Sequence, residues 1–426
     1  MAIAGGIIVI LAFAAIIKKY ETRMVLLAAG FLMCFIGGVT GNAVTTFSKT
    51  MVHGSLVPVI CTVMGFSFVM KITTCDRHLV ESISGVITRS KLILIPLATL
   101  LTWWINIAIP SAAGCSAAVG SILIPTLMAA GVHPAMAAAA VLAGTWGSAI
   151  SPGQAHNIFV ADLAQTDLMT VIMAQVPAAI IASIVAVVTL TAIAVLRGEG
   201  PDDARREAYH LRLEREEGGK NFKVNPIYAL VPLVPLVLLV LGSKQIAVLP
   251  LTDVPTAMIV GTVLALVVTR ANPQEITRKF FDGMGEAYGG VIGLIVSAAV
   301  FTAGMTAMGL TDALIEAMKG SESVAKIAGA FGPFIIAVIS GSGDAAALAF
   351  NGAITPHAET FGMTIIDLGS LAQMAGSIGR SMSPVAGAAL VCAGLAKVSP
   401  MELSKRNALP MLLATITFMI VLFLGK

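Results

Sequence analysis

Two charged residues stand inside otherwise apolar stretches of this sequence. Arg380 lies in the middle of the stretch 364–397, and Asp344 closes the short motif Gly341–Asp344. A charge at membrane depth is costly, so such a residue is expected to have a function. The planar guanidinium of Arg380 suits a carboxylate held by two hydrogen bonds. We predict that Arg380 binds an anionic ligand; the structural alternatives are an ion pair with Asp344 and a position at the membrane interface.

Asp344 has two interpretations of its own. It is placed either to bind a coupling cation or proton, or to cap the helix that follows it. His156 and Asn157 end another polar motif, Ser148–Asn157, from which they can donate hydrogen bonds to a carboxylate. A lone histidine in such a place is also often a structural group, and that reading stays open for His156.

Four clusters of Gly, Ser, Pro and uncharged polar residues interrupt the apolar stretches: Asn106–Ser116, Ser148–Asn157, Ser340–Asp344 and Gly379–Pro384. Irregular backbone is tolerated at membrane depth only where protein or water satisfies it. Broken helices also expose free amides at their N-termini, which attract anions. We therefore predict one polar pocket where the four clusters meet, with small-residue helix packing as the alternative.

The predicted residues of this pocket come from all four clusters. The ligand-binding set is Ser111, Gly114, Ser151, Gln154, His156, Asn157, Ser340, Ser342, Gly343, Arg380, Ser381 and Ser383. Asn106 is predicted to join Asp344 at the coupling-ion site, where the ion is sodium or a proton.

The composition indicates the environment of this pocket. The 426 residues are 57% hydrophobic and 12% charged, with a mean hydropathy of +0.93. A soluble domain has about a quarter charged residues, so we expect an all-α polytopic membrane protein. A net charge of +3 gives no reason to expect a nucleic-acid partner. Five cysteines without a CxxC pair are interpreted as small buried side chains, and no metal site is predicted.

Enzymatic alternatives find little support in the sequence. The motif Gly341–Asp344 fits the GxGD pattern of intramembrane aspartyl proteases, but that chemistry needs a second carboxylate. Asp162, Asp312 and Asp367 all fall near predicted span ends. The sequence has no HExxH, GxSxG or Walker motif. We predict a secondary transporter that is not an enzyme and has no cofactor.

Apolar runs of about 20 residues are long enough to cross a membrane, and they divide the chain into two halves of five spans. The predicted spans are 3–17, 24–40, 54–71, 168–196, 226–242, 255–271, 289–309 and 400–424, with re-entrant hairpins at 91–130 and 324–360 and broken helices at 133–166 and 364–397. The segments 41–53, 72–90, 272–288 and 310–322 are predicted to be interfacial.

Internal similarity and charge support this division. Gly147–Pro152 aligns with Gly379–Pro384, and Ser111–Gly114 with Ser340–Gly343, at a near-constant spacing of about 230 residues, as in transporters built from repeats. With five crossings per half the halves are inverted. Twenty Lys and Arg residues then lie on one face and five on the other. We predict that both termini are periplasmic and that the linker 197–224 is cytoplasmic.

The stretches Gln373–Gly387 and Ala393–Pro400 resemble the DcuC-type anaerobic carriers of four-carbon dicarboxylates, as do the tip Ser340–Asp344 and the hairpin Pro110–Gly131. The resemblance implies membership of the ion-transporter superfamily and a homodimer in the bacterial inner membrane that works as an elevator. The implied scaffold is 1–90 and 225–322. The implied transport domain is 91–196 and 323–426.

The resemblance also implies succinate, fumarate and malate as substrates, moved by exchange or by cation-coupled antiport or symport. The sequence departs from the family pattern at Asp344, where asparagine is expected, and at Gly153–Asn157, where Thr-Ser-Gly-Asp is expected. These departures leave open a carrier for a monocarboxylate, citrate or an amino-acid-like anion. A cation/proton antiporter that uses Asp344 also stays open.

Overall fold

The computed structural model describes residues 1–18, 20–54, 56–84, 93–205, 207, 224–242, 248–250, 253–318 and 322–424, which form helices and no strands. The predicted all-α class is therefore confirmed. Most of the predicted linker lies outside these residues, as do parts of the predicted segments 72–90 and 310–322.

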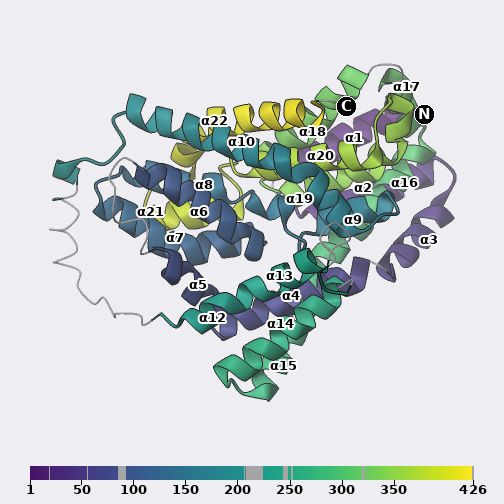
Figure 1. Cartoon of the computed structure of the whole chain (residues 1–426). Coiled ribbons are helices and arrows are strands. Elements are labelled where there is room, and N and C mark those ends of the chain that lie inside the picture. Colours follow the sequence, from purple (N-terminus) through teal and green to yellow (C-terminus); the bar gives the residue numbers. More distant parts are fainter. Residues whose placement is uncertain are drawn as a thin grey trace.

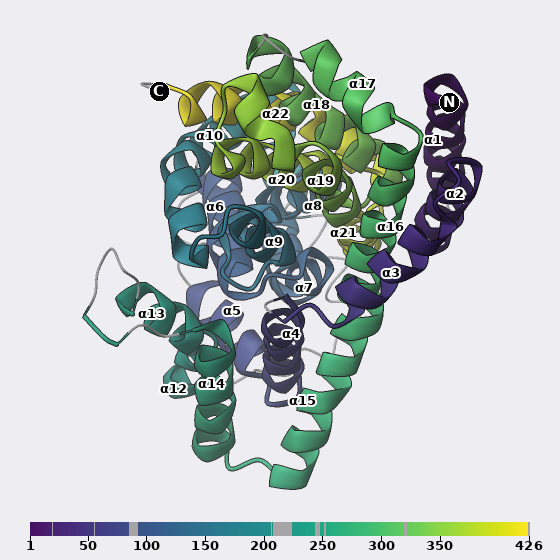
Figure 2. The same ribbon diagram turned by 90° about the vertical axis from the view of Figure 1, so that its right-hand side faces the viewer.

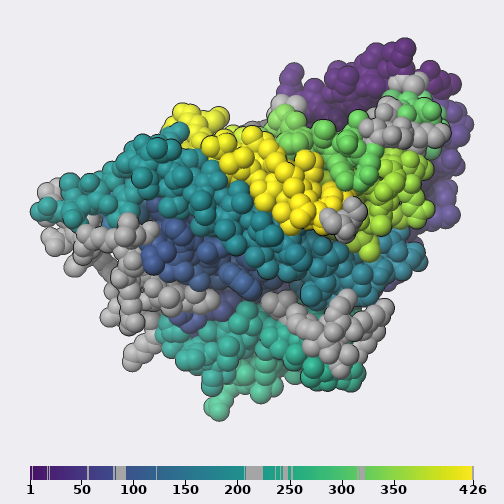
Figure 3. All heavy atoms as spheres, turned by 45° about the horizontal axis from the view of Figure 1, so that its top comes forward, coloured from purple at the N-terminus to yellow at the C-terminus, as the bar shows by residue number. Residues whose placement is uncertain are grey.

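Ten helices from the segments 94–196 and 322–422 pack into one group. They are α6 (Leu94–Ala108), α7 (Ala112–Ala129), α8 (Pro134–Gly144), α9 (Ala155–Leu163), α10 (Leu168–Leu196), α18 (Glu322–Ser340), α19 (Gly343–Ala353), α20 (Ile365–Arg380), α21 (Gly387–Ala396) and α22 (Pro400–Leu422). Helix α10 packs along α22, and α7 along α21, so each half of the sequence contributes to the same core. Figure 3 shows α22 lying against α10 across one face.

The remaining helices form two smaller groups. Helix α2 (Thr22–Ile36) packs on α16 (Gly293–Ala307), with α1 (Ala2–Ile17), α3 (Thr40–Met51) and α17 (Leu310–Met318) beside them. Helix α4 (Leu56–Ile72) packs on α14 (Val254–Thr269) and α15 (Pro273–Ala287), near α5 (Cys75–Ser84), α12 (Pro226–Leu230) and α13 (Val234–Leu241). Figure 1 shows this second group, apart from α5, below the core.

Both predicted hairpins are helix–turn–helix units with short tips. The first turns at Pro110, after which Ser111 caps α7 by accepting a hydrogen bond from the Gly114 amide at 3.1 Å. The second turns at Gly341, whose φ of +78° favours glycine. Ser342 then caps α19.

Both predicted broken helices are interrupted near the expected residues. Helix α8 ends at Gly144 and a 3₁₀ turn covers Gly147–Ile150 before α9 begins. Helix α20 ends at Arg380 and α21 begins at Gly387. Pro152 and Pro384 lie in the two gaps, where proline removes a backbone donor and ends the helical ladder.

The predicted span 226–242 is divided by a 3₁₀ turn at Val231–Leu233, and a second predicted boundary is absent. The segments 272–288 and 289–309 form one helix of 35 residues, Pro273–Ala307, because a π turn at Tyr288–Ile292 carries the backbone past Gly289 and Gly290 without a break. Four helices of the described chain are long and apolar enough to cross a membrane: Leu168–Leu196, Pro273–Ala307, Glu322–Ser340 and Pro400–Leu422. The other apolar helices are shorter, so the count of ten spans stays a prediction.

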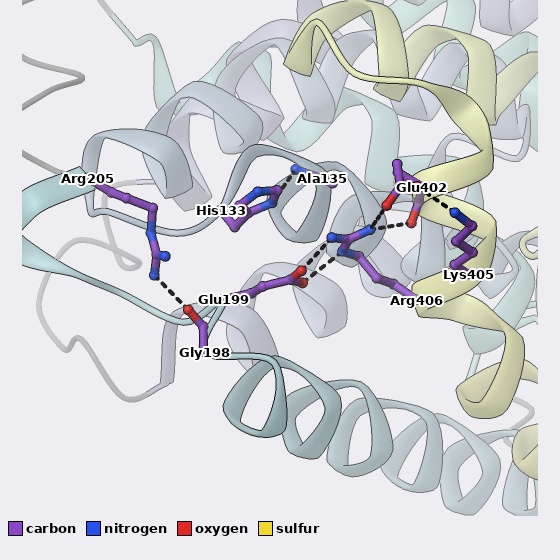
Figure 4. A network of polar contacts seen from close by, with 8 residues as sticks. All are labelled: His133, Ala135, Gly198, Glu199, Arg205, Glu402, Lys405 and Arg406. Atoms are coloured by element: carbon purple, nitrogen blue, oxygen red, sulfur yellow. Dashed lines mark hydrogen bonds and ion pairs between the residues drawn. The ribbon is translucent and has the colours of Figure 1, made fainter.

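The start of the linker is packed against the core rather than separate from it. Glu199, which is 9% exposed, forms an ion pair with Arg406 of α22, which is 3% exposed. Arg406 also donates to the carboxylate of Glu402 at 2.8 Å. Arg205 donates to the carbonyl of Gly131, in the turn between α7 and α8, at 2.9 Å. Figure 4 shows Arg406 between Glu199, which follows α10, and Glu402 at the start of α22.

Candidate functional site

A cavity of about 230 Å³ lies where the two hairpin tips meet the two helix breaks. Figure 2 shows α4, α7, α9, α19 and α21 close together at the centre of the molecule. The core side of the wall consists of Pro110, Ser111, Ala112, Ala113, Gly153, Gln154, Ala155, Asp344, Arg380, Gly387 and Ala388. Helix α4 closes the opposite side with Ile60, Val63, Met64 and Ser67, and Val291 completes it.

Four helices of the described chain begin at this cavity. Ser111–Ala113 start α7, Gln154 and Ala155 start α9, Asp344 is the second residue of α19, and Gly387 is the first residue of α21. The first turn of a helix has amides without intrahelical partners and a partial positive charge. The convergence of four such ends creates a positive electrostatic environment that suits an anion.

Arg380 adds a formal positive charge to this environment. It is the last residue of α20 and only 9% exposed. One terminal nitrogen donates to the carbonyl of Thr145 at 2.7 Å, whereas the buried Nε has no hydrogen-bond partner. No carboxylate lies within 4 Å of Arg380 in the described residues, so the expected alternative of an ion pair with Asp344 is wrong. The guanidinium is buried without a carboxylate in contact, although Asp344 lines the same cavity.

Asp344 and His156 form a second charged element at the cavity. The Asp344 side chain is 42% exposed, and its Oδ1 lies 3.7 Å from Nδ1 of His156 on α9. His156 is fully buried, and neither ring nitrogen has a hydrogen-bond partner. The alternative role of Asp344 as the helix cap is wrong, because Ser342 caps α19 by accepting from the Ala345 amide at 3.2 Å.

Asn157 faces away from the cavity and holds the first break. Its Nδ2 donates to the carbonyls of Ala149 and Ser151 at 2.8 and 2.9 Å. Its Oδ1 accepts from Gln175 at 2.8 Å and from Gln373 at 2.5 Å. The hydrogen-bonding capacity of this amide is taken up by protein, so the structure places Asn157 as a support and not as a ligand.

Asn106 supports the first tip in the same way. Its Nδ2 donates to the Ile109 carbonyl at 2.9 Å, and its Oδ1 accepts from the Ser148 amide at 2.7 Å. The side chain thus ties the tip of the first hairpin to the first break. Neither group remains directed at the cavity for a coupling ion.

The remaining predicted residues shape the tips and breaks. Ser340, Ser151 and Ser383 each accept from a backbone amide two residues ahead. The hydroxyls of Ser381 and Thr145 lie 3.2 Å apart. Gly343 lets α19 approach α20 closely, since a Cβ there would lie 2.7 Å from the Gly376 carbonyl oxygen.

A smaller cavity of about 40 Å³ adjoins the first one. Gly114 and Ser151 line it, and it shares Val63, Ser67, Pro110, Ser111 and Gly153 with the larger cavity. Of the predicted residues, Ser111, Gln154, Asp344 and Arg380 therefore line the main cavity.

Three contributors were missed by the sequence reasoning. Thr145 accepts from Arg380, Gln175 joins the Asn157 network, and Ser67 lines both cavities from α4. Each is an uncharged polar residue within an apolar run, which is a weak signal. Only the position of Thr145, shortly before the Gly147–Pro152 motif, could have drawn attention to it.

Comparison with known proteins identifies the family. The family model described as "C4-dicarboxylate anaerobic carrier" (DcuC) matches residues 2–426. A putative uncharacterized transporter from Haemophilus influenzae is 41% identical over 273 residues, which cover 63% of this chain and 97% of that protein. The anaerobic C4-dicarboxylate transporter DcuC of Escherichia coli K12 is 26% identical over 449 residues, which cover 96% of this chain and 94% of that protein.

Solved structures show the same general fold. Neisseria gonorrhoeae MtrF, described as one of a class of antimetabolite efflux pumps, aligns with a TM-score of 0.59 at 15% identity, over 90% of this chain and 83% of that one. The YdaH transporter of Alcanivorax borkumensis aligns with a TM-score of 0.55 at 14% identity, over 90% and 87%. The chain is therefore a multi-pass membrane transporter, not an enzyme, and belongs to the DcuC family of C4-dicarboxylate carriers.

Proposed function

We propose that this protein is a secondary active transporter of C4-dicarboxylates such as succinate, fumarate and malate across the bacterial inner membrane. The observation that carries the proposal is the cavity in which four helix N-termini meet Arg380, whose Nε lacks a protein partner. A buried charge without a counter-ion in contact is costly. A carboxylate from the substrate would remove that cost, and the family match supports a dicarboxylate.

The two carboxylates of the substrate would bind at different places. Arg380 would hold one through Nε and a terminal nitrogen, in the bidentate geometry that guanidinium favours. The starts of α7 and α9, with Ser111 and Gln154, would bind the other. The cavity accommodates a small anion and several waters but no polymer.

Alternating access would occur by an elevator movement. The hairpins and broken helices pack mainly on one another, whereas α4 forms the facing wall of the cavity. This packing supports a transport unit of 91–196 and 323–426 that moves against a scaffold of 1–90 and 225–322. We further propose inverted repeats, a homodimer, periplasmic termini and a cytoplasmic linker, as the charge distribution indicates.

A second substrate class has one observation in its favour. Among the described residues, Arg380 is the one Arg or Lys that lines the larger cavity, and Lys71 lines the smaller one. One guanidinium serves a monocarboxylate as well as one end of a dicarboxylate. A carrier for a monocarboxylate, citrate or an amino-acid-like anion is therefore the alternative. The third candidate function is a cation/proton antiporter that uses Asp344 and has no organic substrate.

Counterflow with labelled succinate in proteoliposomes tests these alternatives. Vesicles loaded with unlabelled succinate, fumarate or malate should accumulate the label, whereas vesicles loaded with acetate, citrate or glutamate should not. Counterflow of labelled acetate, citrate or glutamate in vesicles loaded with the same anion, without counterflow of succinate, would assign the second class. Absence of counterflow with every anion, together with cation-driven proton flux, would assign the third.

A further inference from the structure

The pair His156–Asp344 stands directly behind the cavity wall. Asp344 turns part of its carboxylate toward the cavity, while its Oδ1 is buried and lies 3.7 Å from the His156 ring. His156 itself is fully buried and does not line the cavity. Both ring nitrogens and Oδ1 lack hydrogen-bond partners, which is unusual because buried polar groups are nearly always satisfied.

Few other charged groups surround the pair. Helices α4, α10, α19 and α20 and the 3₁₀ turn Gly147–Ile150 pack against α9. Helix α19 contributes Asp344 and α20 contributes Arg380, and these two groups act on the charge of His156. Helix α10 and the 3₁₀ turn contain no charged residue. Lys71 of α4, Asp367 of α20 and Asp162 of α9 lie farther along their helices.

The charges of the site do not balance a dianion. Arg380 and Asp344 carry opposite formal charges, so the site with a neutral His156 and a bound dicarboxylate has a net formal charge of −2 in a buried space. Burying unpaired charge is unfavourable. One proton on the His156–Asp344 pair halves this excess, and a histidine with a carboxylate neighbour can change its protonation near neutral pH.

We propose that the His156–Asp344 pair binds one proton together with each dicarboxylate, so that this pair is the coupling site of the carrier. The inference rests on the proposed function. The proton comes from the bulk solution through water in the cavity and reaches the exposed part of Asp344. It is shared with Nδ1 of His156 when the two side chains close their present separation of 3.7 Å to hydrogen-bond distance. It belongs to the pair rather than to either residue, as in other closely coupled groups.

The chemistry of the pair favours a proton over a metal cation. Hard cations such as sodium require several oxygen ligands, whereas Asp344 here faces an imidazole. The amide of Asn106 is already engaged by backbone.

Calorimetric titration of the purified full-length protein with succinate, in buffers of different ionisation enthalpy, measures affinity and proton uptake together. Wild type should take up about one proton per succinate, and its affinity should increase up to about tenfold per unit as the pH falls through the range in which the pair binds the proton. His156→Gln and Asp344→Asn should each bind succinate with no proton uptake. His53→Gln removes the histidine of a partly exposed His–Asp pair outside the cavity and should behave as wild type.

The outcomes separate the two proposals. If wild type binds succinate without proton uptake, the coupling role is wrong while the proposed function stands. The same holds if both variants still take up a proton when they bind succinate. If wild type does not bind succinate at all, the proposed function is wrong and the coupling role fails with it. The melting temperature of each variant shows whether it is folded. Because His156 and Asp344 lie on different helices, one variant still tests the proposal if the other does not fold.

Discussion

Two buried arginines of this protein have opposite surroundings. Arg406 receives two carboxylates from the chain itself: Glu199, through two of its nitrogens, and Glu402 at 2.8 Å. Arg380 receives one backbone carbonyl and no carboxylate. A buried ion requires a counter-charge and full hydrogen bonding. The protein supplies the counter-charge and hydrogen bonds of Arg406, which is therefore structural. Arg380 lacks a carboxylate in contact, and a ligand can provide one.

The largest effect on stability is expected for a substitution of Arg406. Replacing it with Ala leaves Glu199 buried without a partner, and removing one member of a buried pair costs about 3–5 kcal/mol of stability. Thermal unfolding in detergent should show a large fall in the melting temperature. Lys405→Ala is the matched control, since its ion pair with Glu402 is exposed and such pairs contribute about 0–1 kcal/mol. Equal falls for the two variants would contradict the structural assignment of Arg406.

Arg380→Ala should lower substrate affinity and leave stability unchanged, in contrast to Arg406→Ala. The removal of Arg380 eliminates a buried charge that no carboxylate contacts, so the melting temperature should not fall. Succinate affinity should fall by about 2–4 kcal/mol, or roughly 30- to 1000-fold, because a buried carboxylate loses its partner. Arg380→Lys should retain part of the affinity, since the charge remains but the planar fork is lost. Counterflow at a range of succinate concentrations measures the change.

Gly343→Ala tests the close packing that brings the second tip to the cavity. The added methyl would lie 2.7 Å from the Gly376 carbonyl oxygen, and such overpacking costs about 1–3 kcal/mol. Both stability and transport should fall. Gly394→Ala, in the open on α21, is the control and should be neutral or stabilising. A neutral Gly343→Ala would mean that α19 can move away from α20.

Ser342→Ala should have the smallest effect. It removes the side-chain cap of α19, which contributes about 1 kcal/mol, and should accelerate hydrogen exchange at the start of this helix. Ser342→Asn retains a capping group and should keep the exchange slow. Equal exchange in both variants would show that the Ala345 amide finds another acceptor.

The sequence predicted the places where helices end better than the roles of the polar residues there. Helix α10 spans the predicted residues 168–196, and both tips and both breaks lie in the expected clusters, because Pro, Gly and Ser interrupt apolar runs in a recognisable way. The fusion of 272–288 with 289–309 was missed, since a π turn has no clear sequence signal.

The roles of the site residues depend on orientation, which the sequence does not contain. Asn106, Asn157 and Gln154 are similar uncharged side chains, yet the two asparagines bind backbone while Gln154 lines the cavity. Glu199 and Arg406 are 207 residues apart, so their pairing had no local signal. Arg380 was recognisable because an arginine amid apolar residues is conspicuous wherever it points.

The most direct test compares the two arginines in one measurement. The melting temperatures of wild type, Arg380→Ala and Arg406→Ala are recorded with and without saturating succinate, since a ligand that binds the folded state raises the melting temperature. We predict that succinate raises the melting temperature of wild type. Without succinate, Arg380→Ala should melt at the wild-type temperature, and succinate should not raise it. Arg406→Ala should melt at a lower temperature than wild type without succinate, and succinate should still raise it. An undiminished succinate-induced rise in Arg380→Ala would contradict the assignment of this arginine as the substrate's counter-ion.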